Sequence, residues 1–524
     1  MSMTQITPDH AHVAVLAFPF GCHPWPLFNL ACKLAWATPH VRFSFFNTSK
    51  SNQRLFSTSQ VDLPDNLKAY DVADGVPNGH VFTPGNPVEE LELFIKAAPE
   101  SFGKALDMAV AELGRNISCL LTDAFLVCAC EMAQNMHVKW VPFWVPAPYC
   151  LSAHIYTDII HKTYANACGN GNGGVVGGLK PIDKTLDVIP GLSTMRFCDL
   201  SDEVLQGDSN SSLFSQTLYR MSKVLPQASA IVMNSFQEIN STIITNDLKS
   251  KFQDVFYVGF LTLTLPPPPL PPSHSDTTGC LPWLDKQKPT SVAYISFGTV
   301  AAVPPNEFVA LAEALEASGV PFLWSLRDNF KQILPNGFLQ RTSLQGKIVP
   351  WAPQSHVLAH SAVGVYVTHC GYNSVFESIV GEVPMICRPI LGDNMMNGRM
   401  VEAVWGIGVR VEGGVFTKNG MLKSLELVLQ HEQGRRMREK IKELKELVVK
   451  ASGSNVIASK DFKTLVEGRE TGSKHTSLSL LLTEMDNERQ TELISGGCVS
   501  VRLTCCCERK ATCSSGYMTY FLLL

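Results

Sequence analysis

The sequence predicts an α/β protein in which helices cover both faces of parallel β-sheets. Two apolar runs of strand length, at residues 12–19 and 291–297, each precede a glycine-containing turn and a helical pattern that begins at proline. Continuous apolar runs are typical of strands buried on both faces, and proline is favoured in the first turn of a helix. The length of 524 residues is sufficient for two or three domains.

The first strand and helix bring a histidine to the edge of the predicted sheet. Residues 12–19 are HVAVLAFP, and Pro24 and Pro26 open a helix through about Ala37, so that His23 lies at the helix N-terminus. The helix dipole disfavours the imidazolium and keeps the ring available as a base. This suits proton abstraction from a weakly acidic hydroxyl. A loop histidine without a role is the alternative on spacing alone.

A carboxylate ends a second apolar strand. Residues 119–125 are CLLTDAF, so Asp123 lies at the end of a buried run. An unpaired carboxylate is costly there, and pairing with His23 relieves that cost.

A proline-rich stretch gives the best domain boundary. Residues 225–239 predict a buried strand and turn that close the first domain. Residues 263–273, within TLTLPPPPLPPS, then favour a stiff extended linker. In the second domain Thr299 lies in the turn before the helix that begins at Pro304-Pro305, where it is a candidate phosphate donor.

Residues 351–394 contain the densest set of candidate ligand-binding residues. Residues 364–368 predict a buried strand, and a helix begins near Asn373. The free N–H groups of that helix face the crevice at the carboxyl edge of the sheet, which favours a phosphate. His369, Asn373 and Ser374 add donors for a pyrophosphate, and Glu377 can accept hydrogen bonds from two ribose hydroxyls.

The two ends of the same segment suit the rest of a nucleoside diphosphate sugar. The indole of Trp351 can stack on a base, with Gln354 and the backbone of Ala352 reading its edge. Asp393 and Asn394 can bind the hydroxyls of a sugar. Each signal is weak when taken alone, because a histidine after a strand is more often a packing residue.

Composition and the remaining segments narrow the function classes. The 43 basic and 47 acidic residues give a net charge of −4, so nothing favours nucleic acid or an anionic membrane as partner. We expect no secretory signal, no membrane span, and reduced cysteines in a cytoplasmic protein. We assign no chemical role to the Gly/Asn-rich run 169–178, because no predicted strand precedes it and no predicted helix follows it. Residues 431–451 predict an amphipathic helix with a solvated face.

In their order, residues 351–394 resemble the signature box of the plant secondary-product UDP-glycosyltransferases. The resemblance is carried by the W-A-P-Q opening, the H-C-G core and, further along, by Asn373-Ser374, Glu377, Gly381, Pro384, Pro389 and Asp393. The sequence departs from the pattern at Tyr372, where the family usually has Trp, and at Asn394, where it usually has Gln or, in some galactosyl-transferring members, His. Both positions are among those implied to bind the UDP-sugar.

The N-terminal half resembles the flavonoid 3-O-glycosyltransferase branch of that family. The loop FPFGCH is similar to the segment that carries the catalytic histidine, which implies this role for His23, and Asp123 occupies the position of the orienting Asp. Residues 71–77 and 92–102 resemble acceptor-pocket segments. A planar polyphenol needs aromatic walls, and the candidates for acceptor binding are Phe20, Phe125, Phe143, Trp144 and His154. The chain departs from its relatives at Val145, usually Thr, and at Val88, which can be Gln.

The resemblance implies a fold of the GT-B type, with two facing Rossmann-like domains. The expected division is an acceptor-binding domain at 1–258, a linker at 259–278, a UDP-sugar-binding domain with the final helix at 279–467, and a tail at 468–524. The tail is expected to be disordered or an alternative gene-model ending, with a palmitoylated or metal-binding tail as the alternative. The implied protein is a monomer that needs no cofactor and no metal, because the chain lacks the Asp-x-Asp pair that holds a divalent ion on a nucleotide sugar.

The implied reaction is inverting transfer of a sugar, most simply glucose, from a UDP-sugar to the 3-hydroxyl of a flavonol or anthocyanidin. One alternative is a non-catalytic binder of nucleotide sugar or flavonoid. Another is a glycosyltransferase with a different sugar or small phenolic acceptor. A dinucleotide dehydrogenase has similar sheets, but no strand-linked G-x-G-x-x-G with a downstream acid is visible.

Overall fold

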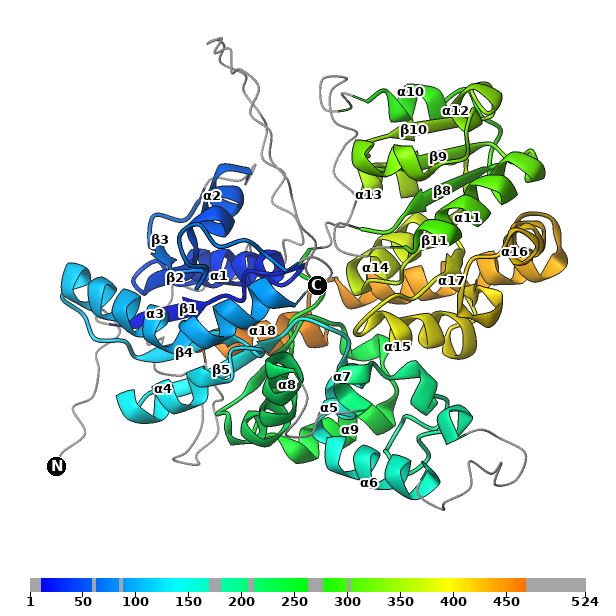
Figure 1. The fold of residues 1–524 in the computed structure, drawn as a ribbon. Coiled ribbons are helices and arrows are strands. Elements are labelled where there is room, and N and C mark those ends of the chain that lie inside the picture. Colours follow the sequence, from blue (N-terminus) through cyan, green and yellow to red (C-terminus); the bar gives the residue numbers. More distant parts are fainter. Residues whose placement is uncertain are drawn as a thin grey trace, which may run out of the picture.

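The computed structural model describes residues 11–58, 63–83, 88–168, 181–205, 212–262, 276, 278–298 and 303–467. In these ranges the chain forms two parallel β-sheets with helices packed on their faces (Figure 1). The α/β fold class with two parallel sheets is therefore confirmed. Thr299, the run 169–178 and the tail 468–524 lie outside the described residues.

The first sheet lies in the N-terminal part of the chain, drawn blue to green in Figure 1. Its strand order in the described chain is β3-β2-β1-β4-β5-β6-β7, and all neighbours are parallel. The strands are β1 (His12–Leu16), β2 (Arg42–Thr48), β3 (Leu67–Val72), β4 (Cys119–Asp123), β5 (Lys139–Trp144), β6 (Ile231–Met233) and β7 (Val255–Tyr257). The strand predicted within 225–239 is present as β6, and β7 is the last strand of the sheet, within the first domain expected at 1–258.

The second sheet lies in the C-terminal part and has the order β10-β9-β8-β11-β12-β13, again among described residues. Its strands are β8 (Val292–Ser296), β9 (Phe322–Ser325), β10 (Gly346–Val349), β11 (Val363–Thr368), β12 (Met385–Cys387) and β13 (Gly408–Arg410). Every residue of β8 and β11 is buried, as expected for central strands covered on both faces.

Helices connect successive strands in both halves. In the first half they are α1 (Pro24–Ala37), α2 (Ser49–Thr58), α3 (Glu89–Leu113), α4 (Cys128–Met136), α5 (Pro148–Ile155), α6 (Thr157–Cys168), α7 (Asp202–Leu205), α8 (Leu213–Val224) and α9 (Thr242–Lys251). In the second half they are α10 (Cys280–Leu284), α11 (Pro305–Ser318), α12 (Phe338–Arg341), α13 (Gln354–Leu358), α14 (Tyr372–Gly381), α15 (Asn394–Arg399), α16 (Lys418–Gln430), α17 (Glu432–Ala451) and α18 (Ile457–Glu467).

Short helical turns complete the described chain. The 3₁₀ turns are η2 (Pro181–Asp183), η3 (Phe197–Asp199), η4 (Leu225–Gln227), η5 (Gln237–Ile239), η6 (Asp328–Ile333) and η8 (Glu412–Gly414). The segment η7 (Met400–Val404) is a π-helical turn that continues α15.

Sequence signals explain where the main helices begin. Helix α1 starts at Pro24 and α11 starts at Pro305, so proline occupies the first turn in both cases, as predicted. Helix α17 buries Met437, Ile441 and Val448 along one stripe, which confirms the predicted amphipathic helix.

The last helix returns to the first sheet. Helix α18, orange in Figure 1, packs Leu465 and Val466 into the apolar core between the first sheet and α1. Its Asp461 carboxylate also accepts a hydrogen bond of 2.8 Å from the backbone N–H of Tyr257 in β7. Helix α18 therefore packs on the first domain, although it follows the second domain in the chain.

Each sheet has one point where the strand order reverses direction. In the first sheet it lies between β1 and β4, and in the second between β8 and β11. The connections after these strands leave in opposite directions, which opens a crevice at their carboxyl ends where ligands bind in α/β proteins. The candidate functional residues lie at these two points.

Candidate active site

A histidine and a carboxylate meet at the reversal point of the first sheet. His23 lies in the loop after β1, and its Nδ1 is 2.8 Å from Oδ2 of Asp123, the last residue of β4. Asp123 is fully buried, and its Oδ1 accepts a hydrogen bond of 2.9 Å from the N–H of Phe125. Because a carboxylate only accepts, Nδ1 carries the hydrogen and the lone pair of Nε2 remains free. The predicted contact between His23 and Asp123 is therefore present.

Aromatic side chains surround this histidine. The centroid of the Phe125 ring lies 4.6 Å from the centroid of the His23 ring, and the centroid of the Phe18 ring lies 5.4 Å from it. Phe20 packs on Phe18 at 5.1 Å and on Phe94 at 5.5 Å. Phe20 and Phe125 are only partly buried, so both leave aromatic surface beside the imidazole.

One predicted acceptor-binding residue faces the wrong side of the sheet. Phe143 is completely buried in the core that contains α1, whereas Trp144 belongs to the core on the opposite face. Successive residues of a strand point to opposite faces, so the two side chains cannot line the same pocket. The acceptor-binding role of Phe143 stays a prediction, and in this structure the side chain packs the core.

Trp144 and His154 form a layer behind the exposed aromatic residues. Trp144 has no exposed surface, and its ring lies 6.0 Å from Phe125 and 5.7 Å from the His154 ring. Its indole N–H donates to the carbonyl of Ala147 at 3.0 Å. Trp144 therefore supports Phe125 from behind and does not itself line a pocket in this structure.

A second histidine lies at the reversal point of the other sheet. His369 follows β11, and its ring fits between Gly298, after β8, and Gly371. A Cβ at Gly371 would lie 2.5 Å from Nε2 of His369, and a Cβ at Gly298 would lie 2.9 Å from its Cε1. Only glycine permits this close approach, and Gly298 also has a φ of +68°.

The N-terminus of α14 presents unpaired polar groups next to His369. The helix begins after Gly371 without a side-chain cap, so its first N–H groups are not satisfied by the protein's own cap. The Nδ1 of His369 and the Oδ1 of Asn373 are buried and have no hydrogen-bond partner among the residues that the structure describes. Buried polar atoms are rarely left unpaired, so this region suits a polar, negatively charged ligand.

Glu377 is held one turn further along α14. Gln354, the first residue of α13, donates from its amide to Glu377 Oε2 at 2.6 Å and to Ser374 Oγ at 3.1 Å. Its carbonyl oxygen accepts from the hydroxyls of Tyr294 and Tyr366, at 3.2 and 3.0 Å. Burial raises the pKa of Glu377, and the hydrogen bond from Gln354 opposes that shift.

The side chain of Gln354 is thus fully used within the protein. In this structure Gln354 positions Glu377, whereas the sequence predicts that Gln354 contacts the edge of the nucleotide base. The sequence analysis missed Tyr294 and Tyr366, although the two residues are direct partners in the pairing of β8 with β11. Trp351, in the loop between β10 and α13, is 57% exposed, and Ala352 is buried beside it.

Asp393 and Asn394 lie at the start of α15, close to the first domain. Asp393 Oδ2 accepts a hydrogen bond of 3.1 Å from the amide of Asn397. Burial raises the pKa of Asp393, while this hydrogen bond and the charge of His23 act to lower it.

The comparisons with known proteins agree with this arrangement. Residues 274–447 match the family model described as UDP-glucoronosyl and UDP-glucosyl transferase. The chain is 50% identical over 467 residues to an anthocyanidin 3-O-glucosyltransferase from Vitis vinifera, which covers 89% of this chain and 98% of the relative. The chain belongs to the UDP-glycosyltransferase family.

Further relatives of this UDP-glycosyltransferase differ in the sugar named. An anthocyanidin 3-O-glucosyltransferase from Fragaria ananassa is 49% identical and covers 87% of this chain and 97% of the relative. An anthocyanidin 3-O-galactosyltransferase from Rhododendron delavayi is also 49% identical, over 89% of this chain and 98% of the relative. A crystal structure of UDP-glucose: anthocyanidin 3-O-glucosyltransferase in complex with UDP has a TM-score of 0.80 at 43% identity, and covers 88% of this chain and 99% of that chain.

Family membership confirms the GT-B fold and excludes the dinucleotide dehydrogenase. In the described part of the UDP-glycosyltransferase, no helix is both long enough and apolar enough to cross a membrane.

Tyr372 does not point toward the predicted sugar position. It is the first residue of α14, only 4% exposed, and its hydroxyl lies 3.1 Å from Ser235 Oγ in the first domain. Its ring packs on Phe260 and Phe376 at 5.3 and 5.0 Å. The assignment of Tyr372 to the UDP-sugar site stays a prediction, and in this structure the start of α14 directs the side chain into the contact between the domains.

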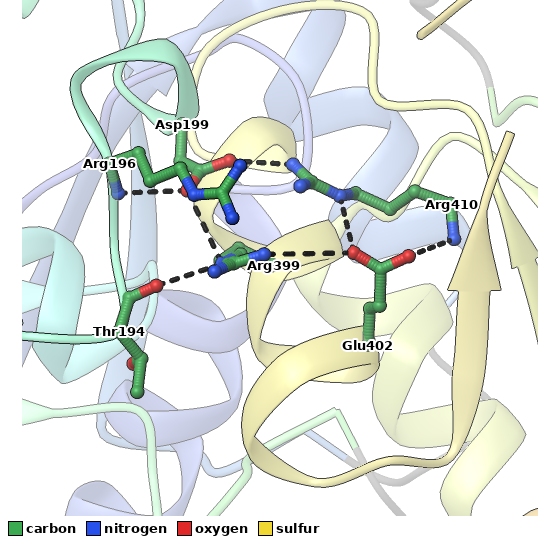
Figure 2. Close-up of polar contacts among 6 residues, drawn as sticks. All are labelled: Thr194, Arg196, Asp199, Arg399, Glu402 and Arg410. Atoms are coloured by element: carbon green, nitrogen blue, oxygen red, sulfur yellow. Dashed lines mark hydrogen bonds and ion pairs between the residues drawn. The ribbon is translucent and has the colours of Figure 1, made fainter. Parts of the chain in front are cut away.

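A cluster of charged residues joins the two domains beside α15 (Figure 2). Asp199 of the first domain is fully buried and accepts a hydrogen bond of 2.6 Å from Arg410 in β13. Arg399, at the end of α15, lies 3.5 Å from Asp199 Oδ2 and donates to the carbonyl of Thr194 at 2.8 Å. Glu402 then accepts from Arg410 at 2.9 Å. The sequence did not predict this cluster, because Asp199 and Arg410 are 211 positions apart and no local pattern relates them.

The two neutral histidines predict a pH dependence of stability. Burial lowers the pKa of His154 and of His369 from 6.5 to about 4. Between pH 6.5 and 4 the unfolded chain binds protons that the folded glycosyltransferase does not bind. The free energy of unfolding should therefore fall as the pH is lowered through this window.

The His154→Gln variant isolates this effect. Its melting temperature should fall less than that of the wild type between pH 6.5 and 4, because glutamine does not titrate. The control His431→Gln, at an exposed position, should follow the wild type. Parallel curves for all three proteins would contradict the assignment.

Proposed function

We propose that this UDP-glycosyltransferase transfers a sugar, most simply glucose, from a UDP-sugar to the 3-hydroxyl of a flavonol or anthocyanidin. The observation that carries the proposal is the hydrogen bond between His23 and the buried Asp123 at the carboxyl edge of the first sheet, which orients the histidine as a base. Asp393 of the second domain is the proposed ligand for the sugar. The identity of 50% to an anthocyanidin 3-O-glucosyltransferase supports the acceptor class.

His23 is the proposed general base. Its free Nε2 takes the proton of the acceptor hydroxyl as that oxygen forms a bond to the anomeric carbon. Asp123 stabilises the imidazolium that results, through the hydrogen bond to Nδ1. The bond from the anomeric carbon to the UDP oxygen breaks, its electron pair leaves with UDP, and the configuration inverts.

The second domain holds the leaving UDP. The uncapped N–H groups of α14 and the unpaired Nδ1 of His369 stabilise the charge that grows on the pyrophosphate. Glu377, positioned by Gln354, binds the ribose hydroxyls. The remaining proposed donor contacts are the exposed face of Trp351 for the base, the backbone of Ala352, Asn373, Ser374 and Thr299 for phosphate, and Asp393 and Asn394 for the sugar.

The acceptor lies against partly exposed aromatic residues of the first domain. Phe20 and Phe125 are the proposed walls, because Phe125 contacts His23, Phe20 packs on the neighbouring Phe18, and both retain exposed surface. His154 is kept neutral by burial, so it offers the acceptor a hydrogen-bonding group without a charge.

We also propose the division into an acceptor-binding unit at 1–258, a linker at 259–278 and a donor-binding unit at 279–467, acting as a cytoplasmic monomer without a metal ion. The described cysteines are free thiols, which supports a reducing compartment.

Product analysis tests the function. Quercetin and cyanidin are each incubated with UDP-glucose, UDP-galactose or UDP-xylose, with and without EDTA, and the products are identified by mass spectrometry. The expected result is a 3-O-glycoside whose yield does not depend on EDTA. UDP binding without transfer to any phenolic acceptor would instead identify a non-catalytic binder, and product at another hydroxyl would correct the acceptor position.

A further inference from the structure

A chain of buried hydrogen bonds connects the first domain to Asp393, the carboxylate that is proposed to bind the sugar. Tyr149, in α5, is 1% exposed, and its hydroxyl donates to Oδ1 of Asn397 in α15 at 2.5 Å. The amide nitrogen of Asn397 donates to the carbonyl of Cys370 at 2.9 Å and to Oδ2 of Asp393 at 3.1 Å. Asn397 itself is fully buried.

The chemistry of its partners fixes the orientation of the Asn397 amide. A backbone carbonyl and a carboxylate only accept, so the NH₂ group must face Cys370 and Asp393. The amide oxygen then faces Tyr149, whose hydroxyl must donate. Burial raises the pKa of Tyr149 well above its ordinary value, which keeps this hydroxyl protonated. Each polar atom of the Asn397 side chain therefore has a defined partner.

The two acceptors of Asn397 belong to two different parts of the donor site. Cys370 has a φ of +69°, a conformation that costs free energy for a residue other than glycine. It separates His369 from Gly371, and the hydrogen bond to its carbonyl helps to hold that conformation. Asp393 uses one oxygen for Asn397 and has the other available for a sugar hydroxyl.

We propose that Tyr149 and Asn397 are positioning residues for the donor sugar, through which the acceptor domain orients the Asp393 carboxylate. The inference rests on the proposed function, in which Asp393 binds the sugar. Tyr149 lies on the first domain and Asp393 on the second, so the hydrogen-bonded chain forms only when the domains are in contact. Domain contact and the orientation of the sugar ligand are thereby coupled.

The variants Tyr149→Phe and Asn397→Ala test this role. Titration calorimetry measures the Kd of UDP and of UDP-glucose for each protein, which requires no acceptor. Loss of one hydrogen bond to a charged group corresponds to about tenfold in affinity. Asn397→Ala should therefore weaken UDP-glucose binding by about tenfold more than UDP binding, and Tyr149→Phe should show a smaller shift of the same kind.

The matched control is Tyr156→Phe. The hydroxyl of Tyr156 donates to Asp247 at 2.8 Å, and both residues lie in the first domain. This variant loses a tyrosine hydrogen bond without affecting the donor side, so its ratio of the two Kd values should equal that of the wild type.

A double variant, Tyr149→Phe with Asn397→Ala, should be no weaker than Asn397→Ala alone, because both changes interrupt one chain. The proposal is overturned if UDP and UDP-glucose binding weaken equally in Asn397→Ala, or if Tyr149→Phe behaves as Tyr156→Phe does. Failure of the proposed function is distinguishable, because it would appear as absence of transfer by the wild type.

Discussion

The His23→Ala variant should lose sugar transfer while it continues to bind UDP. General-base catalysis contributes about 10² to 10⁴ in rate, and we expect kcat to fall by that factor. The physical reason is that Asp123 holds Nδ1 of His23, so Nε2 is the atom that takes the proton, and alanine removes it. Single-turnover product formation measures the loss, and calorimetry with UDP measures the retained binding.

Two further variants make this experiment specific. Asp123→Asn should reproduce most of the loss, because an amide that donates to Nδ1 moves the imidazole hydrogen to Nε2 and removes the base. His431→Ala, at an exposed position of the second domain, should retain wild-type kcat. An active His23→Ala enzyme would assign the proton transfer to another group or to water.

The Asp199→Asn variant should lose more stability than any exposed charge substitution. Asp199 is fully buried and is the acceptor for Arg410 and, at longer distance, for Arg399. Removal of one partner from a buried ion pair leaves charge uncompensated and typically costs about 3–5 kcal/mol. We expect a clear fall in the midpoint of urea unfolding, followed by tryptophan fluorescence.

Asp158→Asn provides the matched control. Asp158 forms an ion pair with Lys223, but its side chain is exposed, so its loss should cost about 1 kcal/mol or less. Equal midpoints for Asp199→Asn and Asp158→Asn would show that the interdomain cluster does not stabilise the fold. A lower midpoint for Asp199→Asn alone supports the cluster as a domain clamp.

The fold was accessible from the sequence because its signals are local. The apolar runs of β1 and β8 and the prolines at the start of α1 and α11 act within a few residues of one another. His23 and Asp123 are 100 positions apart, yet both follow strands, and the carboxyl ends of parallel strands share one edge of a sheet.

The directions of individual side chains are harder to predict from the sequence. Phe143 and Trp144 are adjacent in sequence, and the strand alternation sends only Trp144 toward His23. Tyr372 lies within the signature segment, but the approach of Ser235 from the other domain decides where its hydroxyl points. The local sequence pattern does not show which face of the sheet lines the pocket, and it does not show which residues of the second domain approach the first.

The sequence did not predict a role for Tyr149 or Asn397, for a second reason. Tyr149 and Asn397 are 248 positions apart, and each is an ordinary helix residue when considered alone. Their importance follows only from complementarity between donor and acceptor atoms after the two domains have met.

The return of α18 to the first sheet has a mechanical consequence. The chain crosses between the domains after Phe260 and again between α17 and α18, so two segments of the polypeptide connect the two domains. Two such connections limit how far the domains can separate. The contacts that α15 makes across the boundary, through Asn397 and Arg399, would have to break before the domains could move apart.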